Sequence, residues 1–107
     1  MQISFLIRID KKKQTRWKRA QCFVGSVMDQ GHTIRQFFFE AQGVTSAIAK
    51  ESMPRWIELS SASGAPLVLC SQAVEKYRIA VPDLFVVGGL GTLVEASVLA
   101  DRTISFV

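Results

Sequence analysis

The sequence contains few of the residues that build metal centres and disulfide frameworks. Its 107 residues include one histidine, His32, and two cysteines, Cys22 and Cys70. One histidine and two cysteines far apart in the chain do not make a zinc site, and two cysteines allow one disulfide at most. We therefore expect no bound metal, no disulfide framework and free thiols in a reducing compartment, the cytoplasm.

Nucleotide-binding motifs and long apolar runs are missing as well. Neither G-x-G-x-x-G nor G-x-x-x-x-G-K-[ST] occurs, so we expect no cofactor, and Gly88–Gly91 indicates a tight strand-to-helix turn. No segment approaches the roughly 20 apolar residues of a membrane span. Met1–Ile9 is apolar, but the basic run follows it rather than preceding it, unlike a secretory signal. We expect no membrane association.

Positive charge is concentrated in one segment. The formal net charge is +4, and the segment 8–19 holds seven basic residues against Asp10 alone: Arg8, Lys11, Lys12, Lys13, Arg16, Lys18 and Arg19. Such a cluster can dock an acidic partner or RNA. Since no aromatic platform for stacking bases accompanies it, we favour a solvated loop and first helical turns over direct RNA contact. The role of this segment stays open.

Hydrophobic periodicity switches repeatedly between the strand and helix patterns. Strands are expected at Gln2–Ile9, Thr33–Glu40, Leu67–Leu69, Leu84–Val87 and Thr103–Val107. Helices are expected from Thr15 to a glycine cap at Gly31, at Met53–Ser63, at Ser71–Arg78 and after Gly91, with a loop or short helical turn at Gly43–Lys50. In the last helix Leu90, Leu93, Val94 and Val98 form an apolar stripe expected in the core, with Leu99 off it.

Alternation of strands and helices predicts a parallel sheet with helices on both faces. The hydrophobic fraction of 49% is enough for a core at this length. We predict an α/β fold: a flavodoxin-like three-layer α/β/α sandwich with a five-stranded, mainly parallel sheet. Residues 1–107 should form a single domain.

Cys70 is the strongest candidate for chemistry. It follows the apolar run Pro66–Leu69 and opens the helix Ser71–Arg78, which places it at the carboxyl edge of the sheet, where the strands end. Open α/β folds bind ligands at this edge. The unpaired N–H groups at the start of a helix favour thiolate, the nucleophilic form, over thiol. The alternative is that Cys70 is a small buried hydrophobic residue.

The other reactive residue types have weaker positions. Cys22 lies in mid-helix, opposite the apolar stripe, where backbone N–H groups are already used. His32 precedes the second strand, at the amino edge of the sheet and therefore away from Cys70. Glu95 lies one turn into the last helix, where a structural charge is the simpler explanation and a role near the site stays open.

Several segments together resemble one known family. Trp56–Leu59 with Gly64–Cys70 is similar to the W-x-x-L…G-x-x-L-x-x-C stretch of the DsrE/TusD-like sulfurtransferases. Phe85–Arg102 is similar to that family's terminal G-L-G-x-L-x-E-A-x-x-x-x-D-R pattern. Gly31 and His32, followed by Phe37–Val44, are similar to its second strand and the loop that follows. The resemblance covers most of the chain beyond residue 30, in the same order.

The resemblance implies a cytoplasmic sulfur carrier. The cysteine matching Cys70 would be catalytic, accepting a sulfane sulfur as a persulfide from an upstream donor and passing it to a downstream sulfur-carrier protein. The pathway would be tRNA 2-thiouridine synthesis or cytoplasmic sulfur oxidation. Family members tend to form homo- or hetero-oligomers of DsrE-like subunits. Thiolate attack and thiolate departure carry the step, so that no metal or cofactor is needed.

Two other classes of protein remain open at this stage. The first is a non-catalytic structural or regulatory subunit of a DsrE-like oligomer, in which Cys70 is buried and inert. The second is a small nucleotide- or flavin-binding α/β protein, which the missing phosphate loop argues against.

Overall fold

The five strands form one sheet in which every neighbouring pair is parallel. The computed structural model describes residues 1–107, and the strand order is β4-β3-β2-β1-β5. The strands are β1 (Gln2–Ile7), β2 (Thr33–Phe39), β3 (Leu67–Cys70), β4 (Phe85–Gly88) and β5 (Arg102–Phe106). The predicted α/β sandwich with a five-stranded sheet is confirmed.

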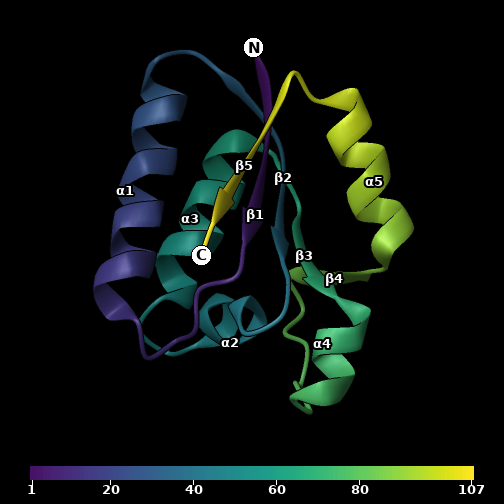
Figure 1. Ribbon diagram of the computed structural model, residues 1–107. Helices are drawn as coiled ribbons and strands as arrows, with labels where there is room; N and C mark the ends of the chain where they lie inside the picture. Colours follow the sequence, from purple (N-terminus) through teal and green to yellow (C-terminus); the bar gives the residue numbers. More distant parts are fainter.

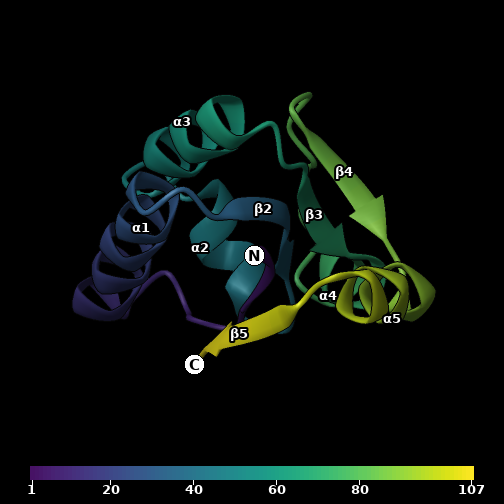
Figure 2. The same ribbon diagram turned by 90° about the horizontal axis from the view of Figure 1, so that it is seen from above.

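Helices connect the strands and lie on both faces of the sheet (Figures 1 and 2). They are α1 (Gln14–Asp29), α2 (Gly43–Ile48), α3 (Met53–Ser63), α4 (Ser71–Lys76) and α5 (Leu90–Leu99). The chain steps in one direction from β1 to β4 and then reverses to place β5 beside β1. Because crossovers between parallel strands are right-handed, α5 lies on the face opposite α1 and α3.

The main core fills the space between the sheet and helices α1, α2 and α3. Alternate residues of β1 and β3 belong to it, whereas a register shift between β1 and β2 interrupts the alternation in β2. The aromatic rings of this core are packed together. The rings of Phe5 and Phe37 stack 5.8 Å apart, and Trp56 meets the edge of Phe39 at 5.2 Å. Burial of several rings of roughly 150–250 Å² each makes this layer the principal source of stability.

The opposite face of the sheet has a much smaller core. Leu6, Phe38 and Val68 form it, and Leu93 of α5 packs against them. The Ser4 hydroxyl donates to the carbonyl of Ala96 over 3.3 Å and ties α5 to β1. This layer is therefore a single helix over three buried side chains.

The prediction that the α5 stripe belongs to the core is wrong for most of its residues. Only Leu93 is half-buried, whereas Leu90, Val94 and Val98 are 74%, 53% and 76% exposed. One helix on this face has nothing packed over its outer side, so the apolar residues there stay uncovered. Periodicity identifies an apolar face, and it cannot tell a core from a contact surface.

Element ends agree with the sequence expectations to within a few residues. Gly31 adopts a left-handed φ of 88° after α1, as a glycine cap should. The segment Gly43–Ile48 is a helix, and α4 ends at Lys76 because Arg78 adopts a left-handed φ of 52°. None of the helices is both long and apolar enough to cross a bilayer.

Candidate functional site

Cys70 is the last residue of β3 and the N-terminal cap of α4. It is a free thiol of intermediate exposure, opposite Gly88 in the register of β3 and β4. Its side chain packs against both hydrophobic cores, which lie on opposite faces of the sheet. The predicted position at the carboxyl edge of the sheet is confirmed.

The local sequence explains why the thiol is held at this edge. Leu67, Val68 and Leu69 are buried and fix β3 in the sheet, while Ala73 anchors α4 one turn after Cys70. The first N–H groups of α4 have no partner within the helix, and no side chain caps them. They lie at the same end of the helix as the Cys70 sulfur.

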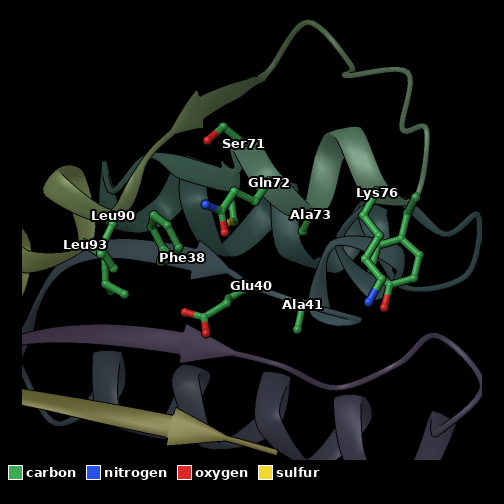
Figure 3. A pocket seen from close by; sticks show the side chains of 11 residues that line it. Phe38, Glu40, Ala41, Ser71, Gln72, Ala73, Lys76, Leu90 and Leu93 are labelled. Carbon is green, nitrogen blue, oxygen red and sulfur yellow. The ribbon is translucent and has the colours of Figure 1, made fainter.

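A pocket of about 340 Å³ opens beside Cys70 (Figure 3). It is lined by residues from β2, β3, α4 and α5 and the segments next to them: Phe38, Glu40, Ala41, Cys70, Ser71, Gln72, Ala73, Lys76, Tyr77, Leu90 and Leu93. Figure 3 shows Leu90 and Leu93 at the end of the pocket opposite Lys76. Most of the residues that line the pocket are hydrophobic, so that apolar side chains surround the Cys70 thiol.

Two charged side chains of opposite sign face this pocket. Glu40 is the residue after β2, and its carboxylate forms an ion pair with the Arg8 guanidinium at 2.8 Å. The Lys76 ammonium lies 5.5 Å from the centre of the Tyr77 ring, within cation–π range. Glu40 and Lys76 were not expected from the sequence, because their presence in one pocket depends on β2 lying beside β3.

The remaining candidates lie elsewhere. Cys22 is exposed on α1, as expected, and does not line the Cys70 pocket. His32 precedes β2 at the amino edge of the sheet, so that roughly 20 Å of strand separates its end of the sheet from the edge at Cys70. Glu95 is exposed on α5 and is not part of the pocket wall.

The glycine turn between β4 and α5 shapes the rim of the site. A Cβ atom on Gly88 would lie 2.7 Å from Cγ1 of Val68, whereas Gly89 and Gly91 have open space around them. Neither Gly89 nor Gly91 has a positive φ. The structural requirement for glycine therefore lies at Gly88, which lets the end of β4 approach β3 beside Cys70.

The chain matches one known protein family over almost its whole length. The model of the DsrE/DsrF-like family matches residues 1–106. The chain belongs to the DsrE/DsrF-like family. The match includes every strand and helix described above, so that the resemblance seen in the sequence motifs extends over the whole fold.

Individual relatives of this DsrE/DsrF-like protein are distant in sequence. A DsrE protein of Allochromatium vinosum is 27% identical over 106 residues, covering 78% of this chain and 82% of the relative. The sulfurtransferase TusD of Salmonella paratyphi B is 28% identical over 106 residues, covering 78% and 83%.

The fold is also similar to a solved structure. The E. coli ychN protein superposes with a TM-score of 0.83 at 17% identity, covering 99% of both chains. At this level of identity the similarity concerns the fold alone.

Proposed function

We propose that this DsrE/DsrF-like protein is a sulfurtransferase of a sulfur relay and that Cys70 carries the sulfur as a persulfide. The position of Cys70 carries the proposal: the thiol ends β3 at the carboxyl edge and lines a pocket of about 340 Å³. The name of the TusD relative supports the same general role. We place the protein in the cytoplasm, where free thiols persist.

The chemistry needs little beyond an accessible thiolate. The Cys70 thiolate attacks the terminal sulfur of a donor persulfide, a new S–S bond forms to Cys70, and the donor leaves as a thiolate. A partner thiolate then attacks the terminal sulfur in the same way and restores Cys70. Each step exchanges one S–S bond for another, so that no outside oxidant or reductant is consumed.

The partners are an upstream sulfur donor and a downstream carrier protein, in tRNA 2-thiouridine synthesis or cytoplasmic sulfur oxidation. We also propose that the protein works as a homo- or hetero-oligomer with DsrE-like subunits. The exposed residues Leu90, Val94 and Val98 on α5 support assembly, because contiguous apolar surface of this kind marks contact sites.

A second candidate is a non-catalytic structural or regulatory subunit of such an oligomer. The same apolar face of α5 favours it, since assembly alone would account for that face. Cys70 would then be a packing residue between the two hydrophobic cores.

Intact-protein mass spectrometry separates the two functions. Wild type, Cys70→Ser and Cys22→Ser are each incubated with a cysteine desulfurase and cysteine, then with and without reductant. We expect a reversible gain of one sulfur atom in wild type and Cys22→Ser and none in Cys70→Ser. If folded wild-type protein gains no sulfur, the persulfide role fails and the subunit role is favoured; sulfur retained in Cys70→Ser would move the carrier to another site.

A further inference from the structure

The loop between β1 and α1 presents an uncompensated positive surface. Lys11, Lys12, Lys13 and Arg16 are exposed, and none has a carboxylate within 4.0 Å. We call these four side chains the basic surface. Three of them, Lys12, Lys13 and Arg16, line two adjoining shallow grooves, one of which also contains Arg8 and Asp10.

Hydrogen bonds hold the backbone of this loop in place. The Trp17 indole donates to the Lys11 carbonyl at 3.0 Å, and the Lys11 N–H donates to the Thr45 hydroxyl at 3.0 Å. The Asp10 carboxylate accepts from the Lys12 N–H at 2.8 Å. Asp10 is thus used to shape the loop, and the lysine ammonium groups remain free on a fixed backbone, which lowers the entropy cost of binding.

The basic surface lies on the same edge of the sheet as Cys70. β1 and β3 are separated only by β2, so that their carboxyl ends lie about 10 Å apart. The Arg8–Glu40 ion pair joins the two regions, because Arg8 lines the basic groove and Glu40 lines the Cys70 pocket. A protein interface of about 800 Å² per partner is roughly 30 Å across and would cover both.

The position in the fold also favours binding. The strand order reverses where β5 is placed outside β1, and open parallel sheets bind ligands at the carboxyl edge near such a reversal. The groove that contains Arg8, Lys13 and Arg16 lies at this point.

We infer that the basic surface docks an acidic segment of the partner protein that exchanges sulfur with Cys70. This inference rests on the proposed function, since a sulfur-exchanging partner must bring its own thiol to the Cys70 pocket. Charge complementarity identifies the partner as acidic and steers its approach. RNA fits less well, because Trp17 is buried and the surface offers no aromatic ring for base stacking.

A disulfide-exchange assay tests the inference without requiring a persulfide. In a Cys22→Ser background, Cys70 is converted to its mixed disulfide with thionitrobenzoate, and a peptide thiol displaces that group. The release of coloured thionitrobenzoate gives the second-order rate constant. The probes are three short peptides with a single cysteine flanked by glutamates, by glutamines or by lysines.

At low ionic strength we expect the glutamate peptide to react about tenfold faster than the glutamine peptide, and the lysine peptide to react more slowly than both. Lys11→Glu with Lys12→Glu should abolish this preference. Arg35→Glu with Arg102→Glu changes the net charge equally on exposed residues towards the amino ends of β2 and β5, and it should retain the preference. Salt of about 0.5 M should remove the preference in every variant.

Three results would overturn the inference. The first is an equal rate for the glutamate and glutamine peptides in the parent protein. The second is an equal loss of preference in the two charge-reversal variants, which would assign it to net charge. The third is tighter binding of a single-stranded RNA than of the glutamate peptide, lost in Lys11→Glu with Lys12→Glu, which would assign the surface to RNA. If the protein accepts no sulfur but still reacts faster with the glutamate peptide, the proposed function is refuted and the inference about the basic surface stands.

Discussion

The backbone of Gly43, the first residue of α2, packs directly against the backbone of Ile7, the last residue of β1. A Cβ atom on Gly43 would lie 1.9 Å from the Ile7 carbonyl oxygen and 2.7 Å from the carbonyl carbon. Both residues are buried, and the atoms that a Cβ would meet belong to the backbone rather than to a flexible side chain that could yield. This contact fixes the chain between Glu40, in the Cys70 pocket, and the helix that supports it.

Gly43→Ala should destabilise the protein by about 3 kcal/mol, because the backbone of β1 or α2 must shift to admit a methyl group. The free energy of unfolding in urea measures the effect. Gly91→Ala is the matched control: a Cβ atom there meets nothing within 4 Å, and alanine is favoured over glycine in a helix. Equal stability of the two variants would contradict the close approach of α2 to β1.

The two tryptophans should respond differently to the loss of their indole nitrogen. Trp17 is buried and donates to the Lys11 carbonyl, whereas the buried Nε1 of Trp56 has no partner. Trp17→Phe loses volume and a hydrogen bond, while Trp56→Phe loses volume and removes an unpaired donor. We therefore expect Trp17→Phe to lower the free energy of unfolding by about 1–2 kcal/mol more than Trp56→Phe does. A larger cost at Trp56 would show that its nitrogen is satisfied in solution.

The outer side of α5 should govern self-association. Val94→Glu with Val98→Glu places charges on the exposed apolar side, and it should shift the mass measured by light scattering towards the monomer as the protein is diluted. Stability of the monomer should change by no more than about 0.5 kcal/mol per site, because both side chains are exposed.

Ser61→Glu on α3 is the control for this test, since Ser61 is exposed on a helix of the opposite layer. It should leave the mass unchanged. A wild-type protein that is monomeric at every concentration would refute a homo-oligomer through α5, and an equal effect of Ser61→Glu would assign the change to charge alone.

The positions read directly from local sequence were predicted well. The strand-to-helix boundary at Cys70 and the helix end at Gly31 depend on neighbouring residues only, and both are confirmed. The presence of Glu40 and Lys76 in one pocket depends on which strands are neighbours, and hydrophobic periodicity carries no information about strand order. For the same reason the Arg8–Glu40 pair was not predicted.

The positions that require glycine show the same limit of prediction from sequence. The sequence singles out the run Gly88–Gly91, and a tight turn there predicts a cost for a bulky side chain at Gly91. Gly91 has neither a positive φ nor a close neighbour, whereas Gly88 and Gly43 have close contacts with distant parts of the chain. Steric demands set by tertiary contacts are invisible until the fold is known.

The pairing of β1 with β5 determines when the sheet can be completed. β1 contains the second to seventh residues, and its partner on one side begins at Arg102. During synthesis the second edge of β1 stays without hydrogen bonds until β5 has emerged, and contacts between segments so distant in the chain form slowly. Until then the nascent protein carries an open, apolar strand edge that can recruit other chains, so that β5 protects β1.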